Sequence, residues 1–147
     1  MMLRPMLAAI LATAVILPSI ALAGPIEDRQ AIMKGNGRDT KMGGDMLKGA
    51  VPFDAATANK ILANYAAAAK AFPTHFPASS KTGGETEASP AIWTMAADWK
   101  IATDKFQKDT AAAAAMTVTD AASFGKAFGM VTANCKSCHE GFRIKKS

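Results

Sequence analysis

The strongest constraint on the fold is a helical spacing of apolar residues that recurs in four segments, which are separated by proline and glycine. Apolar residues three and four positions apart share one face of a helix, whereas a strand needs strict alternation, and that pattern is almost absent. The chain has 147 residues, of which 50% are hydrophobic, so it suits one domain with an ordinary core. Four helices with mostly short connections predict an all-α, antiparallel up-down-up-down four-helix bundle.

Capping residues and helix breakers set the expected ends of these helices. The helices are expected over residues 26–48, from Asp54 to the residue before Pro73, from Ser89 into the alanine run at 111–115, and from Thr119 or Asp120 onward.

The first of these helices contains four glycines, Gly35, Gly37, Gly43 and Gly44. Each glycine costs about 1 kcal/mol relative to alanine in a helix interior. We therefore expect either a break near Gly35 or a neighbouring group that approaches the helix closely.

Residues 1–23 differ from the rest of the chain. Arg4 is followed by the apolar run MLAAILATAVILPSI, and the small residues Ala21 and Ala23 stand just before Gly24. This order is typical of a secretory signal peptide, because the run is short for a membrane-spanning helix and Pro18 interrupts it. We expect this segment to be cleaved, which leaves residues 24–147 as the mature domain in an oxidising, extracytoplasmic compartment.

The charge of the mature chain is mildly positive. Without Arg4, 16 basic and 12 acidic residues remain, so the net side-chain charge is +4. Such a charge favours docking to acidic protein partners. The sequence lacks the basic clusters with interleaved aromatic residues that bind nucleic acid, and no further apolar stretch is long enough to span a bilayer.

Both cysteines lie in the segment NCKSCHEGFR, residues 134–143. The apolar face of the fourth helix steps at intervals of four and three through Phe124, Phe128, Val131, Cys135, Cys138 and Phe142. Cys135, Cys138 and His139 form the pattern C-x-x-C-H, which indicates covalent attachment of one c-type haem. Residues three apart on a helix have Cβ atoms about 5–6 Å apart, so two sulfurs reach the two vinyl groups of one porphyrin edge, and His139 turns to the iron as axial ligand.

Three other interpretations of the motif stay open. A structural zinc site needs a fourth ligand, for which only His75 remains. A thiol-disulfide exchange site usually occupies a helix N-terminus near a βαβ pattern, whereas this pair lies near a helix C-terminus in an all-α chain. The third interpretation is a pair of buried structural cysteines followed by an incidental histidine.

Arg143 lies one helical turn beyond His139, on the same side of the helix. One interpretation is that it hydrogen-bonds near the proximal histidine and tunes the iron. The other is a solvated arginine near a helix C-terminus, which the helix dipole favours.

With its attachment motif in the last of four helices, the chain resembles class II cytochrome c, the cytochrome c′ family. The segment CKSCHEGFR matches the haem site of that family closely, and RQAIMKGNGRDTKMGGDMLKG and SPAIW resemble its first helix and the start of its third. The resemblance covers the whole mature chain and implies a bundle that encloses one covalently bound haem.

The resemblance also implies a position for the sixth ligand. Family members are either high-spin, with an open distal side, or low-spin, with a first-helix methionine on the iron. The distal position corresponds to Met33, and its context IMKGNGR is closer to the low-spin branch. Arg29, one turn earlier, is expected to pair with a haem propionate. Core filling is the alternative role of Met33, since methionine often fills cores, and Met42 and Met46 are lesser candidates.

Five aromatic side chains are candidates to wall the haem or to fill the ordinary core: Phe72, Trp93, Trp99, Phe124 and Phe128.

The function implied by the resemblance is that of a periplasmic bacterial monohaem cytochrome, which carries single electrons between redox partner proteins, its iron held between His139 and Met33. Within the family, the alternative is a five-coordinate protein that binds nitric oxide or carbon monoxide. An alternative of another class is a thiol-disulfide oxidoreductase that uses Cys135 and Cys138 without haem.

The sequence contains no nucleophile–base pair or carboxylate dyad, so we do not expect an enzyme. Family members are monomers or homodimers, and the sequence does not distinguish the two.

Overall fold

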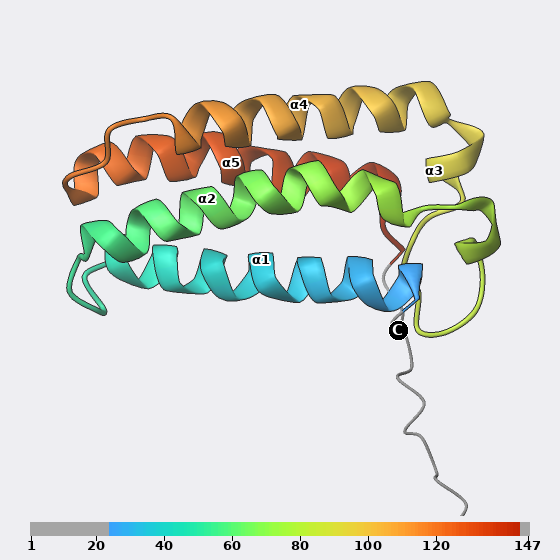
Figure 1. Cartoon of the computed structure of the whole chain (residues 1–147), viewed down its shortest axis with the longest axis horizontal. Coiled ribbons are helices and arrows are strands. Elements are labelled where there is room, and N and C mark those ends of the chain that lie inside the picture. Colours follow the sequence, from blue (N-terminus) through green and yellow to red (C-terminus); the bar gives the residue numbers. More distant parts are fainter. Residues whose placement is uncertain (1–23, 145–147) are drawn as a thin grey trace, which may run out of the picture.

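The computed structural model describes residues 24–144, so the expected signal peptide at 1–23 lies outside the described residues. Four long helices run side by side in alternating directions, as Figure 1 shows: α1 (Pro25–Leu47), α2 (Ala55–Ala71), α4 (Ala96–Ala114) and α5 (Ala121–Phe142). The expected all-α four-helix bundle is confirmed. Within residues 24–144, none of the helices combines the length and apolarity needed to cross a membrane.

Two aspartates begin helices as the sequence predicts. Asp54 precedes α2, and its carboxylate accepts a hydrogen bond from the Thr57 backbone N–H at 2.7 Å. Asp120 precedes α5 and forms a capping box with Ser123, whose backbone N–H donates to the aspartate at 2.7 Å. Each carboxylate satisfies a backbone donor that the first helical turn leaves free. Of the two candidates for the cap of the last helix, Asp120 is therefore the cap.

The expected third helix is broken, which corrects the sequence prediction. A short helix α3 (Ala91–Thr94) ends at Met95, whose φ of −119° and ψ of 50° are not helical, and α4 begins at the next residue. The break turns α3 across the end of the bundle, where Ile92 is buried and the Trp93 indole N–H donates to the Phe76 carbonyl at 3.0 Å. Met95 itself is 51% exposed.

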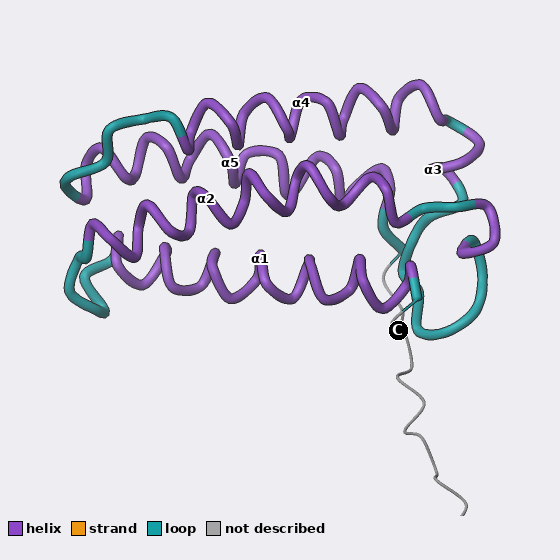
Figure 2. The backbone as a smooth tube through the Cα atoms, in the orientation of Figure 1, coloured by secondary structure: helices purple, strands orange, loops and turns teal. Residues whose placement is uncertain are grey.

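The connection between α2 and α4 is the longest in the described chain and gathers at one end of the bundle (Figure 2). It contains two short 3-10 helices, η1 (Phe72–His75) and η2 (Ala78–Ser80), before α3 begins. This connection faces the first turns of α1 and the last turn of α5, so it closes that end of the bundle.

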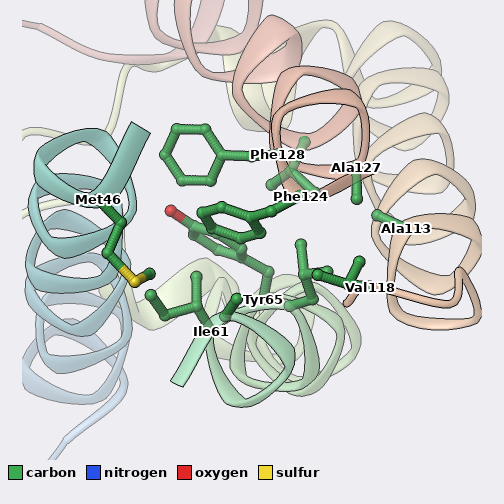
Figure 3. Packing of buried hydrophobic residues seen from close by; sticks show 11 residues of the cluster. Met46, Ile61, Tyr65, Ala113, Val118, Phe124, Ala127 and Phe128 are labelled. Atoms are coloured by element: carbon green, nitrogen blue, oxygen red, sulfur yellow. The ribbon is translucent and has the colours of Figure 1, made fainter. Parts of the chain in front are cut away.

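The packed core occupies the opposite end of the bundle. Figure 3 shows Met46, Ile61, Tyr65, Phe124 and Phe128 meeting there, from the C-terminal half of α1, from α2 and from α5. The complete buried cluster is Met46, Ala58, Ile61, Leu62, Tyr65, Ala113, Val118, Phe124, Ala127, Phe128 and Val131. Its apolar burial is the main favourable term for the folding of this half of the bundle.

The glycines of α1 do not break the helix, which runs continuously from Pro25 to Leu47. Gly43 is buried, and the ring of Phe128 lies against it so closely that no β-carbon fits between them. The second of the two expectations, a close approach by a neighbouring group, is therefore confirmed at Gly43.

Candidate haem site

A cavity of about 780 Å³ fills the half of the bundle next to the α2–α4 connection. Its walls come from all four long helices and from the connection, and its apolar lining includes Tyr65, Phe72, Trp99, Phe106 and Phe142. Cavities that enclose whole cofactors fall in the range of about 300–1,000 Å³. The bundle thus has a packed half and a hollow half, and Tyr65 belongs to both.

The C-x-x-C-H residues lie on α5 and line this cavity. Cys135 and Cys138 are half-buried free thiols, and burial raises the pKa of each. A reactive exchange thiol needs the opposite shift, so these surroundings disfavour the thiol-disulfide interpretation. The two thiols, three residues apart and facing a cavity of cofactor size, fit thioether attachment of a porphyrin.

His139, next to the second cysteine, also lines the cavity. Loss of solvent lowers its pKa, and the nearby Arg143 cation lowers it further, while Glu87 opposes both. A neutral imidazole keeps a ring nitrogen free for a metal. His75, the other histidine, does not line the cavity; its ring nitrogen Nδ1 lies 3.5 Å from Asp28 Oδ2, which leaves the zinc interpretation without its fourth ligand there.

Met33 lies on α1, half-buried, and lines the cavity with its neighbour Asn36. The Asn36 side-chain amide donates to the Met33 sulfur at 3.8 Å. Met46 is buried in the packed half and Met42 is 44% exposed, and neither lines the cavity. Among the three methionines of α1, the structure thus brings Met33 alone to the cysteines.

Arg29 is buried, and its guanidinium ties α1 to the α2–α4 connection. One nitrogen donates to the His75 carbonyl at 3.0 Å and to Ser80 Oγ at 2.8 Å, and the other donates to the Ser80 carbonyl at 2.9 Å and to Thr86 Oγ1 at 2.5 Å. The guanidinium also lies 4.7 Å from the centroid of the Phe76 ring. Burial lowers its pKa, but arginine stays charged. These contacts give Arg29 a structural role that the sequence did not indicate, and its pairing with a propionate stays a prediction.

Arg143 lines the cavity just beyond α5, and its Nε donates to the Glu87 carboxylate at 2.5 Å. Neither interpretation from the sequence included this partner. Glu87 belongs to the α2–α4 connection, where no periodic pattern marks a residue as part of a site. Asn36 could have been found, because a residue three positions from Met33 shares its helix face.

The aromatic candidates divide between the two halves of the bundle. Phe72 and Trp99 line the cavity, as one interpretation expected. Phe124 and Phe128 belong to the packed core. Trp93 lies in neither group: it is part of the α2–α4 connection and contacts Phe76 there. Tyr65 at the boundary shares a 2.7 Å hydrogen bond with Thr40 of α1, and burial raises its pKa to about 12.

A polar cluster holds α5 to α4 directly before the first cysteine. The buried Asn134 donates to the Asp109 carboxylate at 2.9 Å, while Lys105 donates to the same carboxylate at 2.5 Å and to Asn134 Oδ1 at 3.1 Å. These bonds fix the rotation of α5 about its axis, and hence the direction in which Cys135 points.

A four-helix bundle whose last helix turns a C-x-x-C-H motif into an internal cavity defines a helical-bundle c-type cytochrome. The family model described as Cytochrome C′ matches residues 24–143. The chain therefore belongs to the cytochrome c′ family, the class II cytochromes c. Members of this family are non-enzymatic haem proteins with one covalent c-type haem, for which Cys135 and Cys138 supply the C-x-x-C pair.

Relatives support this membership over nearly the whole chain. The chain is 46% identical to a cytochrome c′ of Rhodopseudomonas palustris over 131 aligned residues, and this alignment covers 88% of each protein. It is 35% identical over 146 residues to a cytochrome c-556 of Agrobacterium fabrum, which covers 99% of each. The solved structure of cytochrome c′ from Rhodopseudomonas palustris superposes with a TM-score of 0.77 at 44% identity, covering 86% of this chain and all of that one.

Proposed function

We propose that this protein is a one-electron carrier whose haem iron is held between His139 and Met33. The observation that carries the proposal is the position of Met33, the one methionine of α1 that lines the cavity with Cys135, Cys138 and His139. A thioether is a soft ligand that raises the potential of haem iron and suits electron transfer.

The proposed site of action is the bacterial periplasm. Cytochromes of this family are usually periplasmic, and residues 1–23 have the pattern of a signal peptide. Export with cleavage before Gly24 predicts that the periplasmic holoprotein has the mass of residues 24–147 plus one haem. Intact-mass measurement on the periplasmic fraction tests this, and a protein that retains residues 1–23 would contradict it.

A five-coordinate protein that binds nitric oxide or carbon monoxide is the second candidate. It is favoured by the higher identity to a relative named cytochrome c′, 46%, than to one named cytochrome c-556, 35%. In that case Met33 fills the distal side of the cavity without a bond to iron.

Visible absorption spectra of the oxidised and reduced holoprotein separate the two candidates. If Met33 is the ligand, the wild type is low-spin and shows a thioether-to-iron charge-transfer band, and it binds carbon monoxide slowly. Met33→Ala then becomes high-spin, with a lower potential and rapid carbon monoxide binding. Met42→Ala, on the exposed side of the same helix, is the matched control and keeps the wild-type spectrum. A high-spin wild type that Met33→Ala leaves unchanged would establish the gas-binding candidate instead.

A further inference from the structure

The α2–α4 connection is joined to the end of α5 by backbone hydrogen bonds. The Ser89 N–H donates to the Phe142 carbonyl at 3.0 Å, and the Ile144 N–H donates to the Glu87 carbonyl at 2.8 Å. Ala88 and Arg143 lie opposite each other in this antiparallel bridge. The bridge positions Glu87 and Arg143 through their main chains, so their backbones stay in place whatever side chains they carry.

The side chains of Glu87 and Arg143 form an ion pair at the wall of the cavity. Arg143 Nε lies 2.5 Å from Glu87 Oε2, the Arg143 side chain is 45% exposed and the Glu87 side chain 35%, and both residues line the cavity with His139. The Arg143 backbone N–H also donates to the His139 carbonyl at 3.2 Å, so the Arg143 side chain leaves the backbone one helical turn beyond the histidine. Both charges therefore lie at the partly exposed edge of the cavity, beside the candidate haem site.

We propose that Glu87 sets the reduction potential of the haem by neutralising the Arg143 cation beside it. Reduction adds one negative charge to the haem, so an uncompensated cation at the cavity wall favours the reduced state and raises the potential. The Glu87 carboxylate cancels most of the electrostatic field that the Arg143 cation exerts on the haem. The inference rests on the proposed placement of the haem in this cavity with His139 on the iron, but not on ligation by Met33.

The two single charge removals shift the potential in opposite directions and the double removal leaves it nearly unchanged, which a merely structural role would not produce. Glu87→Gln keeps the size and an acceptor for Arg143 but removes the negative charge, so the potential rises. Arg143→Gln removes the cation and leaves the carboxylate, so the potential falls. The double variant restores neutrality and returns close to the wild-type potential. Arg143→Lys keeps the charge and also stays close to wild type.

The matched control is the pair Lys136 and Glu140 on the same helix. Their charged atoms are 3.7 Å apart, their side chains are 85% and 65% exposed, and neither residue lines the cavity. Solvent screens such exposed charges strongly. Glu140→Gln changes the formal charge of the protein as much as Glu87→Gln does, yet should shift the potential far less.

The experiment is a spectroelectrochemical titration of the six holoproteins, namely wild type, the four variants above and Glu140→Gln, at low and at physiological ionic strength. The expected result is a rise for Glu87→Gln, a fall for Arg143→Gln, near-wild-type values for the others, and smaller shifts at the higher salt concentration. Shifts of the same sign for Glu87→Gln and Arg143→Gln, or equal shifts for Glu87→Gln and Glu140→Gln, would overturn the proposal.

Two readouts separate this proposal from the proposed function. The visible spectrum of each variant reports the ligands, so a change of potential counts only where the spectrum matches wild type. A high-spin wild type would refute ligation by Met33 and leave the sign pattern of the charge variants to be judged alone. If Glu87→Gln fails to incorporate haem, Arg143→Gln and Arg143→Lys still decide, because equal potentials in those two variants contradict the proposal.

Discussion

Gly43 of α1 and Phe128 of α5 touch with no room for a β-carbon: one placed on Gly43 would lie 2.5 Å from Cε2 of the Phe128 ring. The ring is held in turn by Tyr65 and Phe124, with centroids 6.3 and 5.2 Å away. Gly43→Ala therefore forces the packed half of the bundle apart, and we expect a loss of about 1–3 kcal/mol in the free energy of unfolding.

The neighbouring glycine is the control for this substitution. A β-carbon on Gly44 meets nothing within 4 Å, so Gly44→Ala should gain about 0.5–1 kcal/mol from helix propensity alone. Denaturant unfolding followed by circular dichroism measures both variants. Equal effects of the two substitutions would show that the contact with Phe128 is unimportant.

Arg29 should contribute to stability through its contacts with the α2–α4 connection. Arg29→Gln removes the charge from four hydrogen bonds and the contact with Phe76, so we expect a loss of about 2–4 kcal/mol, because each bond to a charged donor contributes about 1.5–3 kcal/mol and the contributions overlap. Arg38→Gln, at an exposed position of the same helix, is the control. Unfolding in urea gives both values, and similar losses would contradict the structural role.

Covalent haem attachment should depend on both cysteines. Cys135→Ser or Cys138→Ser removes one thioether and lowers the holoprotein yield, and the double variant should leave apoprotein, measured by the pyridine haemochrome assay. Because the hollow half of the bundle has little packing of its own, the apoprotein should melt well below the holoprotein. Normal covalent haem in the double variant, or equal thermal midpoints, would contradict this prediction.

Asp109 should make stability sensitive to acid. Its hydrogen bond from Lys105, with a second from Asn134, holds the pKa of the carboxyl below its ordinary value. A carboxyl with a lowered pKa in the folded state stabilises that state above the ordinary value of about 4, and the contribution disappears as the pH falls through the folded pKa. The free energy of unfolding should therefore fall more steeply below pH about 4 in wild type than in Asp109→Asn.

The control for Asp109 is Asp104→Asn, which removes an exposed ion pair with Lys100 on the same helix. Chemical unfolding of the holoproteins at several pH values gives the slopes. Parallel curves for wild type and Asp109→Asn would show that the polar cluster before Cys135 does not contribute to acid sensitivity.

The sequence predicted those features that depend on periodicity and local capping. The ends of α2 follow from the Asp54 carboxylate and from Pro73, and the burial of Phe124 and Val131 follows from the spacing of four and three. The C-x-x-C-H motif predicted the candidate haem site because its chemistry is contained in five consecutive residues.

Features that depend on contacts between distant segments were not predictable. The break at Met95 arises where α3 turns over the end of the bundle, although the sequence there keeps a helical spacing. Arg29 finds its acceptors about 46–57 positions away, and Glu87 meets Arg143 through a loop of irregular sequence. No local pattern in a single sequence contains such pairings.

Met33 and His139 stand on the first and last helices, so the proposed bonds to iron would close a loop of roughly a hundred residues, which by its length costs about 4 kcal/mol of chain entropy. The proposed bond to the sulfur, the weaker of the two, would survive only while α1 stays packed against the rest of the bundle. The visible absorption spectrum would then depend on the packing of α1, because a partial opening that frees α1 would change the spin state of the iron before the helices themselves unfold. The visible spectrum of such a protein would report directly whether its first and last helices, α1 and α5, are still packed together.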